Sequence, residues 1–250
     1  MSTVQRITVE SVQICDRTLT LNRDQHHYLT RVLRLREGDR FVAMDGSGRW
    51  WETELVQRED GQWQGNLLQV LDLNRELPVR VTLLAGLPKG QGFDEVVRQT
   101  TELGVSRIIP VVSDRTLLNP SPNKLQRWQR IATEAAEQSE RQWVPPIQEP
   151  LSFAGAIEAV ADSRAYLCVA RGEVPHLQTQ LRQPLSSPPP DTEEITIAIG
   201  PEGGWTPEEV QQARQAHWQP VSLGRRVLRA ITAPAVAVAM IAAHYESQSL

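Results

Sequence analysis

The segment from residue 195 to residue 245 constrains the fold more than any other part of this 250-residue chain. It opens with an apolar run, Ile195 to Ile199, which predicts a buried strand. The run ends in the loop Gly200-Pro201-Glu202-Gly203-Gly204, whose glycines indicate a special backbone geometry. A helix is predicted to follow, because Thr206, Pro207 and Glu209 have the spacing of an N-cap, a first-turn proline and a capping box.

A second unit of strand, loop and helix comes directly after the first. Its apolar run, Pro220 to Leu223, leads to Gly224 and the basic loop Arg225-Arg226-Val227-Leu228-Arg229, and an Ala/Val/Ile-rich helix is predicted from Thr232. Ligands of open α/β sheets bind where loops leave the carboxyl ends of strands. The two loops therefore predict a ligand site. The alternative is that their glycines only form tight turns, since short glycine motifs also occur by chance.

Together, in this order and spacing, the two loops resemble the cofactor-binding end of the SPOUT class of RNA methyltransferases. The resemblance is closer still to the RsmE family, which methylates N3 of a uridine in bacterial 16S ribosomal RNA. It implies an α/β fold whose C-terminal segments form a deep trefoil knot, a topology that no periodicity in the sequence indicates. The resemblance extends over nearly the whole chain and is strongest at residues 89–143 and 195–241.

The resemblance also implies a cofactor and the residues that bind it. S-adenosylmethionine is expected to bind the two loops, and the residues implied are Ile199, Gly200, Glu202, Gly203, Gly204, Leu223, Gly224, Val227 and Leu228. Arg229 is the candidate catalytic residue, because a cation near O2 or O4 stabilises the anion that develops on uracil. Glu202 is the second catalytic candidate, as proton acceptor. Its alternative role is to hold the loop by accepting backbone N–H bonds.

Two positions depart from the family pattern. Ile231 stands where the family commonly carries Glu, and Gln99 stands where it usually carries Lys. These departures keep open a second hypothesis, a catalytically inactive RNA-binding factor of ribosome assembly with the same fold. A third hypothesis is a nucleotide or phosphate binder at the start of the helix after residue 204. The absence of a Walker lysine after the glycines argues against it.

Residues 1–72 are predicted to form a separate small β domain. Runs rich in β-forming residues occur at 7–14, 40–44, 50–57 and 63–71, with Asp45-Gly46 and Asp60-Gly61 as turn signals between them. Between the first two runs, Asp24 is predicted to cap a short helix that buries Leu29, Val32 and Leu33. This arrangement resembles the family's N-terminal domain, a compact PUA-like β-barrel.

Four arginines of this domain are the predicted RNA contacts: Arg6, Arg31, Arg34 and Arg36. The alternative for the last three is an ordinary solvated surface. RNA is favoured because phosphate-binding arginines position a substrate for a catalytic domain that reads the base.

Residues 73–250 are predicted to form the methyltransferase domain. Its first unit is a strand at 79–87 and a helix that buries Phe93, Val96 and Val97 and ends at Gly104. A later strand, residues 165–170, is followed by Arg171-Gly172-Glu173, which is expected to be the third loop of the cofactor pocket.

Composition limits the partners. The net charge is −4, yet 24 of the 26 cations are arginine, which binds phosphate better than lysine does. Cys15 and Cys168 are far apart, and no metal site is predicted. With no signal peptide or membrane span predicted, a cytoplasmic protein is expected.

The partner implied is 16S ribosomal RNA within the small ribosomal subunit. A homodimer is also expected, because the 232–245 helix is apolar nearly all round and SPOUT enzymes place their sites beside a two-fold interface.

Overall fold

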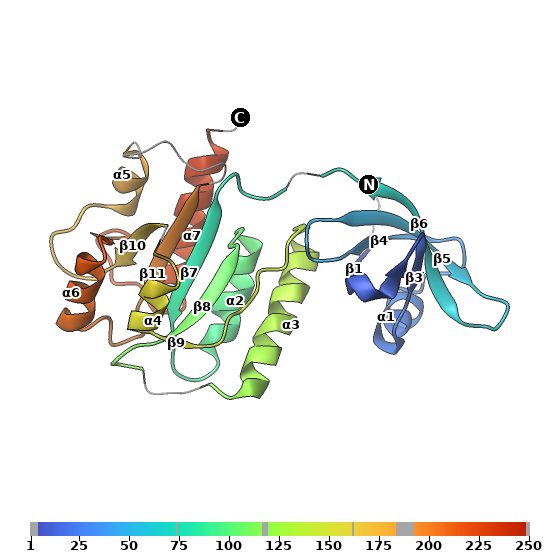
Figure 1. Cartoon of the computed structure of the whole chain (residues 1–250), viewed down its shortest axis with the longest axis horizontal. Helices are drawn as coiled ribbons and strands as arrows, with labels where there is room; N and C mark the ends of the chain where they lie inside the picture. Colours follow the sequence, from blue (N-terminus) through green and yellow to red (C-terminus); the bar gives the residue numbers. More distant parts are fainter. Residues whose placement is uncertain (1–4, 74, 117–119, 162, 184–192, 249–250) are drawn as a thin grey trace. The chain divides into compact units, whose positions relative to one another are not determined.

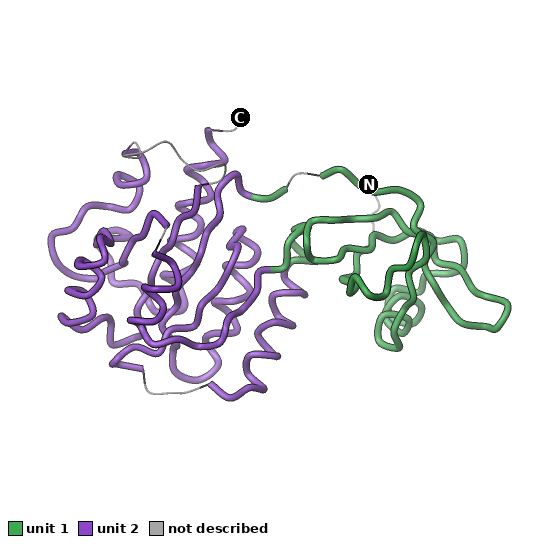
Figure 2. The backbone as a smooth tube through the Cα atoms, viewed as in Figure 1, with its two compact units in different colours: residues 1–76, 136–144 green, residues 77–135, 145–250 purple. Residues whose placement is uncertain are grey.

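The computed structural model describes residues 5–73, 75–116, 120–161, 163–183 and 193–248. The chain divides into two units, residues 1–76 with 136–144 and residues 77–135 with 145–250 (Figure 1, Figure 2). The segment 136–144 belongs to the first unit although it follows a long stretch of the second.

Unit 1 is built on a six-stranded curled sheet in the order β1-β4-β5-β6-β3-β2 (Figure 1). The strands are β1 (Arg6–Thr8), β2 (Ile14–Cys15), β3 (Thr18–Thr20), β4 (Arg40–Met44), β5 (Trp50–Gln57) and β6 (Trp63–Leu71). The last three have the bounds that were predicted. Its core contains Leu19, Phe41 and Leu55, all fully buried.

The predicted strand at 7–14 is wrong as a continuous element. The chain leaves β1 after Thr8 and forms the 3₁₀ turn η1 (Ser11–Gln13) before β2. Gln13 accounts for the break, because its side-chain oxygen accepts a hydrogen bond from the Glu10 amide (2.8 Å) while its amide group donates to the Thr20 carbonyl (2.8 Å). These local bonds favour a turn over a continued strand.

The helix of unit 1 differs from the prediction at its start and along its buried face. α1 (Arg23–His27) is capped by Asn22, not Asp24, since the Asn22 side chain accepts from the Gln25 amide at 2.9 Å. The helix continues as the π turn η2 (Tyr28–Val32). The wider π turn changes which side chains face inward. Leu29 is buried as predicted, but Val32 is 56% exposed.

Unit 2 is a parallel six-stranded sheet in the order β12-β10-β11-β7-β8-β9 with helices on both faces (Figure 1). Its strands are β7 (Arg80–Gly86), β8 (Arg107–Val112), β9 (Leu151–Ser152), β10 (Arg164–Cys168), β11 (Glu194–Ile199) and β12 (Gln219–Val221). Its helices are α2 (Gly92–Glu102), α3 (Pro122–Gln138), α4 (Phe153–Glu158), α5 (Leu177–Leu181), α6 (Pro207–Gln215) and α7 (Ala233–Glu246).

The two faces of this sheet have different helical layers. α4 and α6 cover one face, where Phe153 and Ala213 join Leu84 and Ala198 in a single core cluster. α7 packs against β7 and β11 on the other face and also contacts α2 and α5. Ala237, Val238 and Ile241 of α7 are fully buried. Neighbours within unit 2 thus bury part of the apolar surface of α7.

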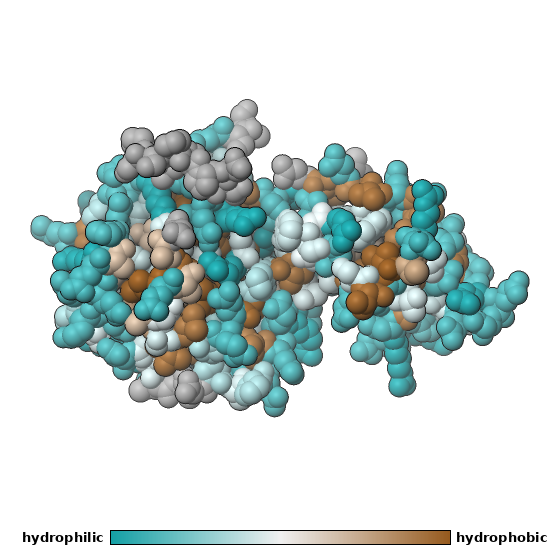
Figure 3. All heavy atoms as spheres, in the orientation of Figure 1, coloured by the Kyte–Doolittle hydropathy of each residue, from teal (hydrophilic) through white to brown (hydrophobic). Residues whose placement is uncertain are grey.

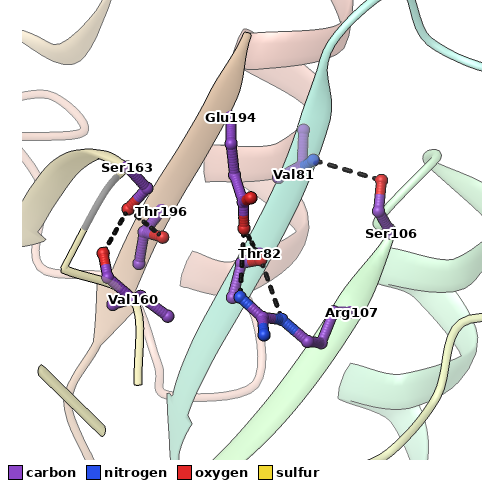
Figure 4. A network of polar contacts seen from close by, with 8 residues as sticks. All are labelled: Val81, Thr82, Ser106, Arg107, Val160, Ser163, Glu194 and Thr196. Carbon is purple, nitrogen blue, oxygen red and sulfur yellow. Dashed lines mark hydrogen bonds and ion pairs between the residues drawn. The ribbon is translucent and has the colours of Figure 1, made fainter. Parts of the chain in front are cut away.

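The amino end of the sheet holds a network of polar side chains (Figure 4). Glu194 accepts hydrogen bonds from the Thr82 hydroxyl and from Arg107, both at 3.0 Å. Ser163 donates to Thr196 at 2.7 Å. These bonds join β11, β7 and β8, and they pair the charges at this edge. The opposite, carboxyl edge of the sheet is where the loops after β10, β11 and β12 emerge, and it holds the residues that the sequence predicts to bind a ligand.

None of the described helices has the length and apolarity that a membrane span requires. In Figure 3 hydrophilic residues border the visible face of unit 2, and hydrophobic residues show at its centre.

Candidate active site

The loop Gly200–Gly204 follows β11 and is held against the end of β7. A Cβ on Gly86, the last residue of β7, would lie 2.5 Å from the Pro201 nitrogen and 2.8 Å from the Gly200 carbonyl carbon. No side chain fits at such distances, so only glycine at residue 86 permits this approach. The sequence did not single out Gly86, because its constraint comes from a segment more than a hundred residues away.

Two further contacts fix the same loop. The Glu202 carboxylate accepts a hydrogen bond from the Lys89 backbone amide at 2.9 Å, which joins this loop to the one after β7. The Arg115 guanidinium donates to the Gly203 carbonyl from the loop after β8. The sequence suggested backbone N–H bonds to Glu202 as one of two roles, and the structure contains such a bond.

The predicted cap of α6 is confirmed and also extends to a neighbouring loop. Thr206 and Glu209 form the reciprocal capping box, in which the Thr206 amide donates to Glu209 at 2.8 Å. The other carboxylate oxygen of Glu209 accepts from the Asp114 amide at 3.0 Å. Glu209 is only 4% exposed. Through its two bonds this side chain caps α6 and also connects the start of α6 to the loop after β8.

A pocket of about 400 Å³ lies between the loops after β10 and β12. Its lining residues are Val169, Ala170, Arg171, Gly172, Val174, His176, Ser222, Gly224 and Arg225. Gly224 was among the predicted cofactor residues, and Arg171 and Gly172 belong to the predicted third loop. The other predicted cofactor residues lie at the end of β11 and in the loops after β11 and β12, but they are not among the described lining residues of this pocket.

The two predicted glycine loops are not neighbours in the sheet, because β10 lies between β11 and β12. This order explains why the loop after β10 forms a pocket wall. Backbone hydrogen bonds connect the segment after β10 with the end of β12. The Val169 amide donates to the Val221 carbonyl at 2.9 Å, and the Ser222 amide donates to the Pro175 carbonyl at 2.9 Å.

Arg229 has a fixed backbone and an exposed side chain. Its carbonyl oxygen accepts from the amides of Thr232 and Ala233, both at 2.9 Å, at the start of α7. Among the described residues none forms an ion pair with its guanidinium. The side chain is therefore available to a substrate.

Ile231 packs against the beginning of α2. A Cβ on Gly92 would lie 2.7 Å from Cγ2 of Ile231, so the isoleucine occupies the space that the glycine leaves. Ile231 is half-buried there. In this chain residue 231 thus contributes an apolar contact between the loop before α7 and α2.

The four arginines predicted to contact RNA have two different environments. Arg31, Arg34 and Arg36 are exposed. Arg6 pairs with Glu140 at 2.6 Å and lies over the Trp50 ring, with its guanidinium carbon 5.6 Å from the ring centroid. Burial, and secondarily the charge of Arg75, lower the pKa of Arg6. Arg6 thus already has partners inside unit 1, which argues against an RNA contact by this side chain. The predicted RNA contact by Arg6 stays a prediction.

Comparisons with known proteins place the chain in a family. Residues 75–242 match the model of the RNA methyltransferase domain, and residues 21–62 match that of the RNA methyltransferase PUA domain. A relative from Synechocystis, ribosomal RNA small subunit methyltransferase E, is 50% identical over 97% of this chain and 78% of its own length. The chain belongs to the RsmE family. The family predicted from the sequence is thereby confirmed.

Other RsmE proteins agree over nearly the full chain. The Bacillus subtilis protein of the same name is 30% identical over 93% of this chain and 92% of its own length. The crystal structure of the Neisseria gonorrhoeae protein, bound to S-adenosylmethionine, superposes with a TM-score of 0.84 at 29% identity and covers 97% of this chain and 98% of its own. The predicted fold class is confirmed: a SPOUT-type α/β knot domain with a PUA-like N-terminal β domain.

The pocket has the size of a small-molecule site. Its volume of about 400 Å³ lies within the usual range of about 300–1,000 Å³ for ligand pockets. Open space lies beside Gly172 and Gly224, because no atom lies within 4 Å of a Cβ built on either residue. Among the described residues, no group of three or more His, Cys, Asp and Glu side chains is arranged to hold a metal ion.

Proposed function

We propose that this RsmE-family methyltransferase transfers a methyl group from S-adenosylmethionine to N3 of a specific uridine in 16S ribosomal RNA. The observation that carries the proposal is the pocket between the loops after β10 and β12, in a chain 50% identical to a ribosomal RNA small subunit methyltransferase. The gonococcal relative of similar structure binds S-adenosylmethionine. Pocket, family and relative support the same methyl donor.

In the proposed reaction the cofactor supplies an electrophilic methyl group, and the chain positions it and stabilises charge. N3 of uracil is a weakly acidic imide nitrogen that must lose its proton, here to solvent, before it attacks the methyl group. Negative charge develops on O2 and O4 as the proton leaves, and an unpaired cation beside them stabilises this anion and lowers the barrier. The N3–CH3 bond then forms as the S–CH3 bond breaks, which leaves neutral S-adenosylhomocysteine. Arg229 suits this role, since its backbone is anchored to α7 and its side chain is exposed.

Glu202 is proposed to position the loop and not to accept the proton. One of its carboxylate oxygens already accepts the Lys89 amide at 2.9 Å, and this bond joins the loops after β11 and β7. A carboxylate that holds these two loops together fixes the position of the loop after β11, which is predicted to bind the cofactor, and near-attack geometry is the first requirement of an in-line methyl transfer.

The function is tested by incubating the protein with S-adenosylmethionine and either small ribosomal subunits or free 16S RNA. Mass spectrometry of the digested RNA should then show N3-methyluridine at one position. Arg229→Ala is the matched control for background methylation. Methylation at another atom of the base, or at a ribose, would contradict the N3 assignment while leaving the methyltransferase assignment intact.

A second candidate function is an inactive RNA-binding assembly factor, which is favoured by Ile231 and Gln99. Calorimetry with S-adenosylmethionine separates the two functions, because a scaffold without chemistry has no requirement for micromolar affinity. Tight RNA binding together with no detectable cofactor binding would favour the assembly factor.

We further propose that the enzyme acts in the cytoplasm as a homodimer on the small ribosomal subunit. Met240 and Val236 of α7 keep part of their surface accessible in the single chain, and a two-fold interface would cover it. Light scattering at micromolar concentration should give twice the 28.1 kDa mass of the chain. A mass equal to that of one chain would contradict the dimer.

A further inference from the structure

The pocket between the loops after β10 and β12 presents two arginines to its ligand. Arg171 comes from the first loop and Arg225 from the second, and both are exposed. The described lining residues include no aspartate or glutamate. Within the described part of the chain, neither guanidinium forms an ion pair. The pocket therefore carries two positive charges without compensation.

Three other arginines of unit 2 are paired with carboxylates. Arg107 pairs with Glu194 at 3.0 Å, Arg127 with Asp94 at 2.7 Å and Arg164 with Glu193 at 3.5 Å. These pairs satisfy their charges within the fold. Two uncompensated guanidiniums on a concave surface attract anions instead, and the planar guanidinium binds carboxylate or phosphate through two parallel hydrogen bonds.

A glycine lies beside each of these two arginines and leaves space for a ligand to approach the guanidinium. Gly172 follows Arg171 with φ +104°, and Gly224 precedes Arg225 with φ +125°. Both values lie in the region that favours glycine, and no atom lies within 4 Å of a Cβ built at either residue. The space next to both guanidiniums is therefore open to a ligand.

Neutral donors add to the same surface. Nδ1 of His176 accepts a hydrogen bond from the Gln178 amide at 3.2 Å, which leaves Nε2 as the ring nitrogen that can donate. Ser222 contributes a hydroxyl group to the lining. Its backbone is held on both sides, because its amide donates to Pro175 and its carbonyl accepts from Leu177 at 3.0 Å. The donors thus stand on a fixed scaffold.

We propose that Arg171 and Arg225 form a clamp for an oxyanion, which the carboxylate of the cofactor's amino-acid part supplies. This inference rests on the proposed function, because it takes the pocket to be the cofactor site. Two guanidiniums repel the sulfonium and attract the carboxylate, so the clamp sets which end of the methionine part faces the two arginines. A phosphate of the bound RNA has the same chemistry and is the other source of the oxyanion.

The first arm of the test compares two cofactor analogues by calorimetry. S-adenosylhomocysteine has the carboxylate, whereas 5′-methylthioadenosine lacks it. In the Arg171→Ala/Arg225→Ala double variant, affinity for S-adenosylhomocysteine should fall roughly 10- to 100-fold, the size expected for losing charge-assisted hydrogen bonds. Affinity for 5′-methylthioadenosine should stay unchanged. Arg171→Lys/Arg225→Lys should have an intermediate effect, because lysine keeps the charge but loses the two-pronged geometry.

The second arm measures RNA binding without cofactor at several salt concentrations. If a phosphate supplies the oxyanion, the alanine double variant should bind S-adenosylhomocysteine normally, and the slope of log affinity against log salt should fall by roughly 1.4 to 1.8 for two lost contacts. Arg214→Ala, an exposed arginine in the last turn of α6, is the matched control for both arms.

Unchanged titrations in both arms would overturn the clamp. An equal loss of affinity for both analogues would overturn it too, since the pocket would then have lost its shape and not its anion site. Failure of the wild-type protein to bind S-adenosylhomocysteine would instead contradict the proposed function, and the RNA arm would still decide whether the clamp binds phosphate.

Discussion

At the scale of single residues, the site depends on positions whose constraints have different physical origins. Gly204 has φ +68°, so its constraint is the backbone conformation. The special backbone geometry predicted for the glycines of this loop is present at Gly204 and not at Gly200 or Gly203. Gly86 is constrained by close contact with Pro201. Arg229 is constrained neither by an unusual backbone conformation nor by close contact, and its exposed side chain is available to a substrate.

Arg229→Ala is expected to separate chemistry from cofactor binding. Turnover should fall roughly 100-fold or more, the usual effect of losing one charge-stabilising donor, while cofactor affinity stays nearly intact. Single-turnover methylation and calorimetry measure the two effects. Arg229→Lys should keep part of the activity. Equal losses of turnover and cofactor affinity would show that Arg229 forms part of the pocket wall.

Gly86→Ala should destabilise unit 2 more than Gly204→Ala does. The added methyl group at residue 86 meets backbone atoms of Pro201 and Gly200 below 3 Å, so the expected cost is about 2–3 kcal/mol of unfolding free energy. At residue 204 there is open space and only the backbone conformation is strained, which costs about 1 kcal/mol. Urea unfolding measures both variants. A smaller loss for Gly86→Ala would mean that the loop after β11 moves away easily.

At the scale of elements, hydrogen bonds connect the loops at the carboxyl edge of the parallel sheet. The loop after β11 is bonded to the loop after β7 through Glu202 and to the loop after β8 through Arg115. The loops after β10 and β12 are bonded by backbone hydrogen bonds. The amino edge instead carries the paired network of Glu194 and Arg107. Binding chemistry therefore concentrates at one edge, as in open α/β sheets generally.

Substitutions of Glu202 distinguish a positioning role from proton transfer. Glu202→Gln keeps an oxygen that can accept from the Lys89 amide, so near-normal turnover is expected. Glu202→Ala removes the acceptor and should weaken cofactor binding roughly five- to tenfold. Calorimetry and pre-steady-state methylation test the pair. A large loss of turnover in Glu202→Gln with unchanged cofactor affinity would identify Glu202 as the proton acceptor.

At the scale of the whole molecule, each unit has its own exposed arginines, although the net charge of the chain is −4. In unit 1 these include Arg31 and Arg34, and in unit 2 they include Arg171, Arg225 and Arg229. A protein of modest negative charge can bind RNA when its cations are exposed and its carboxylates are engaged in pairs. We infer that both units contribute to recognition of the ribosomal RNA.

Arg31→Ala/Arg34→Ala should act on RNA binding alone. The apparent KM for RNA is expected to rise, and its salt dependence should become flatter by roughly 0.7 to 0.9 per lost phosphate contact. Cofactor affinity should not change. Arg58→Ala is the matched control, because Arg58 is an exposed arginine of unit 1 that pairs with Asp60 at 3.3 Å. An unchanged KM and salt slope would assign Arg31 and Arg34 to an ordinary solvated surface.

The sequence by itself determined features that depend on near neighbours in the chain. The capping box of Thr206 and Glu209 and the bounds of β4, β5 and β6 follow from local periodicity and local hydrogen bonding. The predicted C-cap at Gly104 is one residue late, because Leu103 is the C-cap of α2 and Gly104 follows it with φ +94°. The two glycine loops were predicted as a ligand site from their place after strands, and the family resemblance added the SPOUT fold class and the cofactor, which periodicity alone does not contain.

Only the tertiary structure decided which distant segments meet. It placed β10 between β11 and β12, assigned residues 136–144 to unit 1 and brought the end of β7 against the loop after β11. It also moved the cap of α1 to Asn22 and turned Val32 outward through a π turn. The physical reason is that local patterns report which face of an element is buried, whereas strand order and loop contacts depend on the path of the whole chain.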